Sequence, residues 1–316
     1  MPFHPDTLPD LSGRVYIVTG ATSGIGYYTT ARLAQHNAHV YICARTAGKG
    51  STTISLIQAL YPNANLSVLV MDHIRLSSVV AATKHFLTKE TRLDGLVNNA
   101  GIMATPFAMT EDGYEEQFQT NYLAHWVFTS HLLPVMLETA KGKPPGSVRI
   151  VNLSSYGHHS APKGGIDLED TSLKDANNMT RYGQSKLANV LHTKTLHRLY
   201  GPSPPSSSTH DKPEIWVSAV HPGLVKSNLG ARAQLPALVR ALIAPIWWVG
   251  GAVDADTGAW TSLHCVAGSE MKSSDAGSYF QRIADPKGWQ SAMAMDGELA
   301  EKLETWTMEE MKGWLG

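Results

Sequence analysis

The chain has 316 residues, of which 43% are hydrophobic and 17% charged, a composition that can fill a large core and argues against a disordered chain or a coiled coil. Lys and Arg total 26 against 27 Asp and Glu, and no basic run stands out, so we expect no nucleic-acid partner. The two cysteines, Cys43 and Cys265, are too few for a disulfide framework or a thiolate metal site, and we expect buried thiols in a reducing, cytoplasmic compartment.

Short apolar runs alternate with stretches of helical length along the chain. They predict strands, in chain order, at 14–19, 39–43, 66–71, 95–97, 147–153 and 215–220. Strands that alternate with helices indicate βαβ units and a parallel sheet covered on both faces, and nearly continuous apolar strands fit that burial. We therefore predict an α/β fold, a Rossmann-type doubly wound parallel sheet in three layers, with residues 1–316 forming one domain.

Three segments fall outside this alternation. The Pro-rich stretch 141–146 precedes the fifth strand, and the longer stretch 201–213, which resembles a linker in composition, is predicted to be a surface loop because motifs that need one sheet continue across it. Residues 235–253 are apolar but contain Arg240, whose charge is costly inside a bilayer, and two prolines. We predict no spanning helix, no secretory signal, and a small helical lid at about 228–252; contact of 235–253 with a membrane surface is left open.

A glycine-rich turn follows the first predicted strand and opens a helix. Its sequence is TGATSGIG at 19–26, with glycines at 20, 24 and 26. Such a turn lets the backbone approach a pyrophosphate, which then lies at the positive end of the helix. The spacing differs from the G-x-G-x-x-G of long dehydrogenases, and glycine clusters are common in ordinary turns. The position between a strand and a helix favours the dinucleotide interpretation.

Two further patterns indicate acid–base chemistry. Tyr182 and Lys186 lie four residues apart, so on a helix they share one face, about 6 Å apart along its axis. A nearby ammonium lowers the pKa of a phenol from its usual value of about 10. Ser154 and Ser155 end the fifth strand, at the edge where open α/β sheets bind ligands, and a hydroxyl there can donate to a carbonyl oxygen. Each pattern also arises by chance, as a surface pair or a plain turn.

Taken together, the motifs resemble the short-chain dehydrogenase/reductase family from about residue 12 to 290. The resemblance rests on four motifs in order: TGATSGIG at 19–26, NNAG at 98–101, Tyr-x-x-x-Lys at 182–186 and His-Pro-Gly at 221–223. Three other stretches are most similar to the retinol-dehydrogenase-like branch: GGIDLED at 164–170, SKLAN at 185–189 and DADTGAWTSLHCVAG at 254–268.

The resemblance implies a hydride transfer between NADP(H) and a carbonyl or alcohol carbon of an apolar small molecule, the activity of a carbonyl reductase or alcohol dehydrogenase. Ser155 would polarise the carbonyl oxygen, with Ser154 as the fallback, and Tyr182 would supply the proton. Lys186 would lower the pKa of Tyr182 and hold the nicotinamide ribose. Asn121 would hold a helix kink and a water that leads to the lysine.

The choice of nicotinamide depends on the end of the second strand. No acid stands there to bond the ribose 2′-hydroxyl of NAD, whereas Arg45 offers a bidentate donor for the 2′-phosphate of NADP, and Lys49 adds charge. The alternative is a pair of solvated surface cations. Asp72 would approach the adenine or cap a helix, or do both. The complete predicted cofactor set is Gly20, Ser23, Gly24, Ile25, Gly26, Arg45, Lys49, Asp72, Asn99, Ala100, Gly101, Tyr182, Lys186, Pro222, Gly223, Val225 and Ser227.

Other features leave alternatives open. Trp247 and Trp248 suggest an apolar substrate under the lid, although a packed cluster or an oligomer contact explains them nearly as well. His158 and His159, just past Ser155, either border the substrate or are turn residues, and the 14 histidines show no metal-binding motif. The rival functions are an idle NADP(H)-binding sensor or scaffold and an epimerase or other non-redox enzyme. A homo-oligomer is also compatible with the resemblance.

Overall fold

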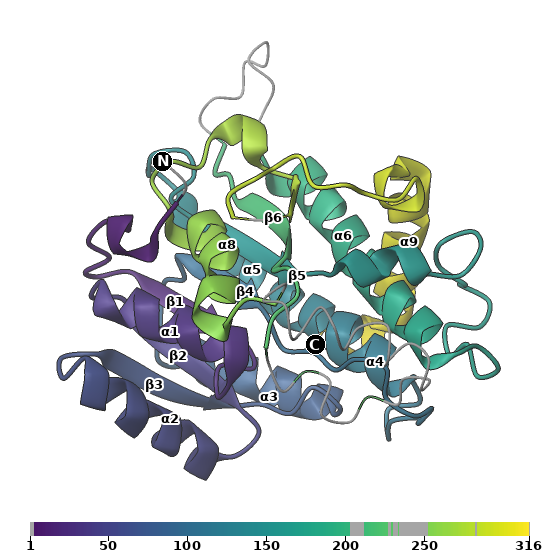
Figure 1. Cartoon of the computed structure of the whole chain (residues 1–316), viewed down its shortest axis with the longest axis horizontal. Helices are drawn as coiled ribbons and strands as arrows, with labels where there is room; N and C mark the ends of the chain where they lie inside the picture. Colours follow the sequence, from purple (N-terminus) through teal and green to yellow (C-terminus); the bar gives the residue numbers. More distant parts are fainter. Residues whose placement is uncertain are drawn as a thin grey trace.

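The computed structural model describes residues 3–202, 212–226, 229, 233, 252–281 and 283–315. At its centre is a seven-stranded, all-parallel sheet in the order β3-β2-β1-β4-β5-β6-β7 (Figure 1). The strands are β1 (Val15–Val18), β2 (His39–Ala44), β3 (Asn65–Val70), β4 (Gly95–Asn98), β5 (Arg149–Leu153), β6 (Trp216–His221) and β7 (Tyr279–Gln281). The predicted doubly wound parallel sheet is confirmed.

The six strands expected from the sequence are all present, each within two residues of its predicted bounds. The last strand, β7, was not predicted, because three residues are too few to form a recognisable apolar run. It pairs in parallel with β6, with Ala219 opposite Tyr279 and His221 opposite Gln281. The pairing of β7 therefore brings the polypeptide beyond residue 281 to the same edge of the sheet as the His-Pro-Gly segment.

Helices connect the strands on both faces of the sheet. They are α1 (Gly24–Gln35), α2 (Ala47–Leu60), α3 (Leu76–Leu87), α4 (Glu116–Phe118), α5 (Ala124–Ala140), α6 (Asn178–Tyr200), α8 (Ala255–Ala267) and α9 (Gly297–Glu310). Side chains cap several N-termini as the residue types predict: Asn177 accepts the N–H groups of Met179 and Thr180, and Asp254 accepts that of Thr257. The short helical turns are η1 (Pro5–Thr7), η2 (Gln119–Leu123), η3 (Tyr156–Ser160), η5 (Ser273–Asp275), η6 (Met293–Met295) and η7 (Lys312–Trp314).

Two hydrophobic cores lie on opposite faces of the sheet. One is built from buried residues of α3, α5, α6 and α9, including Phe128 and Leu187. The other is built from residues of α1, α2 and α8, including Leu33 and Leu263. Full burial of one such side chain contributes about 1.5–3 kcal/mol, so both helical layers are held by many contacts of this kind. The three predicted layers, helix–sheet–helix, are thus present (Figure 1).

Several expectations concern particular segments. Cys43 and Cys265 are buried and carry no disulfide, as predicted, and burial raises the pKa of the Cys265 thiol to about 12. Among the described residues, no helix combines the length and the apolar character needed to cross a bilayer. Residues 203–211 of the surface loop predicted at 201–213, and nearly all of the predicted lid, with Trp247 and Trp248, lie outside the described residues.

Candidate active site

The candidate site lies at the carboxyl edge of the sheet, where β1 stands between β2 and β4 and the strand order reverses. Open α/β sheets bind their ligands in the crevice at such a switch point. Three predicted segments follow strands at this edge: the glycine turn after β1, the NNAG segment at the end of β4, and the serine pair after β5. The fold therefore brings together motifs that are more than one hundred residues apart in sequence.

The glycine turn packs directly against the NNAG segment and leaves no room for side chains. Gly20 and Gly24 have φ angles of +62° and +56°, which side-chain-bearing residues rarely adopt. A Cβ on Gly20 would lie 2.9 Å from Cα of Ala100, and one on Gly26 would lie 2.5 Å from the Gly20 carbonyl oxygen. The side chain of Asn99 donates to the carbonyl of Thr19 at 2.7 Å. The bare backbone forms a cradle of the kind that a pyrophosphate requires.

Helix α1 starts inside this turn. Its N-cap is Ser23, whose side chain makes no capping hydrogen bond. The first N–H groups of a helix carry partial positive charge and favour an anion. The residues present therefore fit a dinucleotide phosphate at this point, as the sequence predicted for Ser23, Gly24 and Ile25.

The His-Pro-Gly segment reaches the same cradle through a contact that the sequence did not indicate. Gly258 on α8 lies so close to Val225 that a Cβ on the glycine would be 2.8 Å from a methyl group of Val225 and 3.4 Å from the side chain of Ile25. Gly223 has a φ of +88°, as expected of a Pro222-Gly223 turn. The structure thus brings Val225 beside the start of α1, whereas Ser227 lies outside the described residues.

Arg45 and Lys49 are exposed at the same edge of the sheet, just after β2 and in the first turn of α2. Asp72 follows β3, and its carboxylate accepts the N–H of Ile74 at 3.4 Å. The alternative interpretation of Asp72 as a helix cap is wrong, because α3 begins at Leu76, whose N–H donates to the carboxylate of Asp112 at 2.8 Å. Asp72 therefore shapes a local turn at the carboxyl end of β3.

Ser155, Tyr182 and Lys186 converge at the ends of β5 and α6. Ser155 caps η3, where its Oγ accepts the N–H of Gly157 at 3.0 Å. Its hydroxyl and the Tyr182 ring lie on the same side of Gly157, since a Cβ there would be 3.3 Å from Ser155 Oγ and 2.7 Å from the ring. The amine of Lys186 donates to the carbonyl of Leu153 at 2.9 Å and lies 5.8 Å from the centroid of the Tyr182 ring. Tyr182 is 2% exposed and Lys186 3% exposed. This arrangement can hold an oxygen atom between the serine and the phenol.

The two neighbouring serines have different partners. Ser154 donates its hydroxyl to the backbone carbonyl of Lys186 at 2.8 Å and is buried, so it ties β5 to α6. Ser155 is only partly buried and faces the phenol. Of the two candidates for polarising a carbonyl, the geometry favours Ser155.

The protonation of the pair differs from the expectation. Burial raises the pKa of Tyr182 to about 12, and the hydrogen bond from Ser155 opposes this rise only in part. Burial lowers the pKa of Lys186 to about 7. The predicted lowering of the phenol pKa by the lysine is therefore not the net effect in this structure, because removal from water disfavours the charged form of both groups and has the larger influence.

Asn121 lies in η2, a π-helical turn between α4 and α5, at the position where the resemblance implied a helix kink. Its side-chain oxygen accepts the N–H of Ile102 at 2.8 Å, and its amide donates to the Ile102 carbonyl at 3.0 Å and to Ser185 Oγ at 2.8 Å. A Cβ on Gly101 would lie 3.1 Å from Asn121 Oδ1 and 3.4 Å from Lys186 Nζ. Asn121 therefore links the residue after the NNAG segment to α6, the helix that carries Tyr182 and Lys186.

An aromatic wall stands beside Ser155, formed by Tyr156, His159 and Trp289. Trp289 lies 4.7 Å from His159 and 5.6 Å from Tyr156, measured between ring centroids. Tyr156 is 42% exposed and Trp289 65% exposed, so the wall offers an uncovered apolar surface. Sequence reasoning missed Trp289, because nothing in the pattern relates residue 289 to residue 155.

Buried His158 anchors this wall to the serine. Its Nε2 accepts the N–H of Ser291 at 3.1 Å, so Nδ1 carries the proton and donates to the carbonyl of Ser155 at 2.7 Å. Burial lowers the pKa of His158 to about 4, which keeps the ring neutral. His158 is thus a turn residue with a structural role, one of the two interpretations left open by the sequence.

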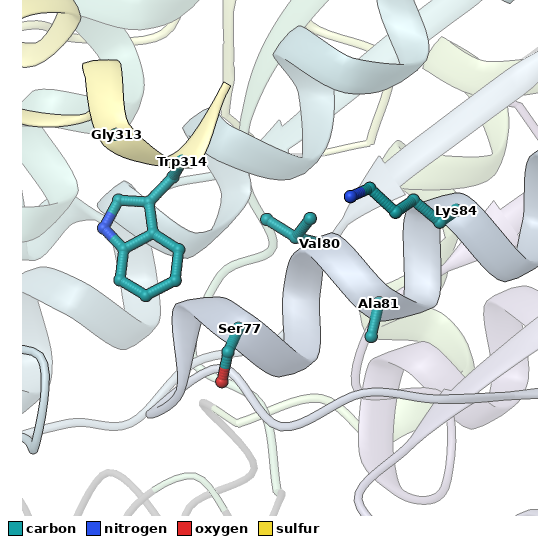
Figure 2. Close-up of a pocket in the computed structure, with 6 residues that line it drawn as sticks. All are labelled: Ser77, Val80, Ala81, Lys84, Gly313 and Trp314. Atoms are coloured by element: carbon teal, nitrogen blue, oxygen red, sulfur yellow. The ribbon is translucent and has the colours of Figure 1, made fainter. Parts of the chain in front are cut away.

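One hollow of the described residues does not form part of this site. A hollow of about 320 Å³ lies between α3 and the C-terminal turn η7, where Figure 2 shows Trp314 opposite Val80 and Lys84. Its lining contains a single charged group, the Lys84 amine, and none of the predicted site residues. Within the described part of the chain, no group of three or more His, Cys, Asp or Glu side chains is arranged to hold a metal ion.

Comparison with known proteins shows which sequences and structures this chain is similar to. Residues 14–166 match the family model described as short chain dehydrogenase. The chain is 48% identical to the short-chain dehydrogenase/reductase drtF of Aspergillus calidoustus, over 98% of each chain. It is 35% identical to human retinol dehydrogenase 12, over 93% of this chain and 84% of that protein. A crystal structure of an uncharacterised protein from Mycobacterium paratuberculosis superposes with a TM-score of 0.73 at 27% identity, covering 99% of this chain and 98% of the other.

Proposed function

Since this chain belongs to the short-chain dehydrogenase/reductase family, we propose that it interconverts a carbonyl and an alcohol on an apolar small molecule with NADP(H). The chain is an oxidoreductase of this family; the cofactor form and the substrate class are the proposal. The observation that carries it is the convergence of Ser155, Tyr182 and Lys186 at the carboxyl edge of the sheet.

Different residues would bind the cofactor and transfer the proton. The glycine cradle and the start of α1 would hold the pyrophosphate, and Lys186 has N–H donors beyond the one given to Leu153 with which to hold a ribose hydroxyl. When bound, the nicotinamide supplies or accepts a hydride. Ser155 donates a hydrogen bond to the substrate oxygen, and Tyr182 gives that oxygen its proton in the reductive direction.

Protonated Lys186 stabilises the phenolate left on Tyr182. The low dielectric of this buried pair strengthens that interaction, but it also makes the ammonium costly to maintain. We therefore expect the activity to depend on pH through the protonation of Lys186.

The direct test is turnover by the purified protein. We expect the protein to consume NADPH with at least one ketone or aldehyde from a panel of apolar ring-bearing and chain compounds. The loss of NADPH absorbance measures this consumption. The rival of an idle sensor or scaffold predicts NADPH binding by calorimetry without turnover on any member of the panel. An epimerase predicts a change in substrate configuration with no net consumption of NADPH.

Arg45 supports the choice of NADP(H), because an exposed guanidinium directly after β2 is suited to a 2′-phosphate. Changing Arg45→Asp is expected to raise the KM for NADPH at least tenfold and to lower the KM for NADH, since a carboxylate repels the phosphate and bonds the 2′-hydroxyl. Steady-state kinetics with both cofactors measure the effect. Lys174→Met, at an exposed position, is the control. An unchanged preference would remove Arg45 from the cofactor site.

The aromatic wall supports an apolar substrate. Changing Trp289→Ala is expected to raise the KM for ring-bearing carbonyl compounds about threefold to tenfold, because aromatic contacts contribute about 0.5–1.5 kcal/mol beyond their buried area. The increase should be smaller for short-chain aldehydes, which reach less of the wall. Leu56→Ala, an exposed apolar position on α2, serves as the matched control. Equal changes for rings and chains would contradict the role of the wall.

A further inference from the structure

His125 lies in the first turn of α5, 3% exposed, four residues after Asn121. Its Nδ1 is 3.0 Å from the backbone carbonyl oxygen of Asn121, and its Nε2 is 2.9 Å from the hydroxyl of Thr19. Thr19 is the residue at which β1 passes into the glycine turn. One imidazole therefore joins the dinucleotide cradle to the π-helical turn beside the catalytic lysine.

The hydrogen bonds of Thr19 determine which nitrogen of His125 carries the proton. The Thr19 hydroxyl oxygen accepts two backbone N–H groups, those of Asn99 and Ala100, both at 2.8 Å. A hydroxyl has two lone pairs and one hydrogen, so these contacts leave only the hydrogen for a further bond. The His125 nitrogen at 2.9 Å is a better acceptor than the Val97 carbonyl at 3.4 Å.

It follows that Nε2 of His125 is the unprotonated acceptor and that Nδ1 carries the hydrogen. The ring then donates from Nδ1 to the carbonyl of Asn121. Burial lowers the pKa of His125 well below its usual value, and His73, 4.8 Å away between ring centroids, together with Lys186 and His192, acts in the same direction. The neutral ring agrees with one donated and one accepted hydrogen bond.

We propose that His125 is a positioning residue that couples the cofactor cradle to the proton-transfer site. Through Thr19 it holds the glycine turn against Asn99 and Ala100, and through the carbonyl of Asn121 it holds the π-helical turn from which Asn121 reaches Ile102 and Ser185. This inference rests on the proposed function, because it requires that the glycine turn bind the cofactor and that the π-helical turn of Asn121 support proton transfer.

The coupling has two arms, the hydrogen bond to Thr19 and the hydrogen bond to the Asn121 carbonyl, which can be tested separately. Asparagine places an amide near the position of Nδ1, so His125→Asn keeps the arm to Asn121 and loses the arm to Thr19. Glutamine reaches the position of Nε2, so His125→Gln keeps the arm to Thr19 and loses the other. His125→Phe fills the ring volume and removes both arms.

The experiment measures the Kd for NADPH by calorimetry and kcat at saturating NADPH for the full-length protein and its variants. We expect His125→Phe to raise the Kd and to lower kcat, each at least fivefold. His125→Asn should return kcat to within threefold of the wild type while the Kd stays raised. His125→Gln should do the reverse.

A control on the same helix separates positioning from stability. His131 bonds the carbonyl of Trp314 at 2.8 Å, so His131→Phe also removes a partly buried imidazole contact of α5. It is expected to lower the Tm without changing the Kd or kcat. If His125→Phe does not fold, the Asn and Gln variants alone decide the outcome.

A readout independent of activity is the tautomer itself. Nitrogen NMR of labelled histidine in the cofactor-free protein should show His125 protonated at Nδ1 only. A ring protonated at Nε2, or wild-type Kd and kcat in His125→Phe, or equal effects of the Asn and Gln variants on both quantities, would overturn the proposal. Failure of the wild type to consume NADPH would instead remove the proposed function, while the NMR result and the Kd would still test the coupling.

Discussion

Changing Tyr182→Phe is expected to lower kcat for NADPH-dependent carbonyl reduction by a factor of about 10² to 10⁴, the usual contribution of a positioned acid or base. The substitution removes only the hydroxyl group. The ring keeps its place against Gly157, where a Cβ would lie 2.7 Å from the ring, so the packing of η3 on α6 is retained. Steady-state kinetics with a substrate turned over by the wild type measure the loss.

The variant should still bind NADPH, because the cradle and Lys186 are unchanged. Tyr41→Phe is the matched control: Tyr41 is also buried, and its hydroxyl donates to Glu90 at 2.9 Å, away from the catalytic helix. We expect full turnover from that control, with some loss of stability. Retention of wild-type kcat in Tyr182→Phe would show that another group supplies the proton.

Strands and helices followed from the sequence wherever the hydrophobic pattern was long enough to carry a period. The strand at 39–44 and the helix at 24–35 illustrate this, since each is bounded by a turn signal. The three-residue β7 has no such pattern, and its position depends on its pairing with β6. Its prediction would have required tertiary information that local sequence does not contain.

The convergence of the site could also be predicted, for a geometric reason. Ser155 follows a strand of a parallel sheet, and Tyr182 and Lys186 share a helix face, so strand ends and helical spacing bring the three together. The partners supplied by other helices and loops were not predictable: Trp289, Gly258 and the contact of His125 with Thr19 all depend on how helices and loops pack.

The direction of the pKa shifts was missed for a different reason. Spacing indicates which groups are neighbours, whereas a pKa depends on how much water each group loses. The hydrogen bond between Ser155 and Tyr182 lowers the phenol pKa, as proximity suggests, but burial of the ring has the larger effect. Sequence motifs cannot predict which of these two effects is larger, because burial depends on the whole fold.

The second large effect is expected for Lys186→Met, which should lower kcat by a factor of about 10² or more because it removes the group that stabilises the phenolate. The same change is expected to raise the free energy of unfolding near neutral pH. The folded protein holds an amine with a pKa of about 7, whereas the ordinary value is 10.5, so burial of the charged form costs free energy. Methionine fills similar space without that cost.

The sign of the pH dependence follows from proton binding. Between pH 7 and pH 10.5 the unfolded chain binds a proton at Lys186 that the folded chain has largely released, so the free energy of unfolding of the wild type rises with pH across this window. Lys186→Met lacks this contribution, and its stability advantage should be largest at or below pH 7 and should shrink toward pH 10.5. Denaturant unfolding at several pH values measures both curves, with Lys174→Met as the exposed control. Parallel curves for the wild type and Lys186→Met would show that the amine keeps an ordinary pKa, and the loss of kcat would then have to arise from its hydrogen bonds alone.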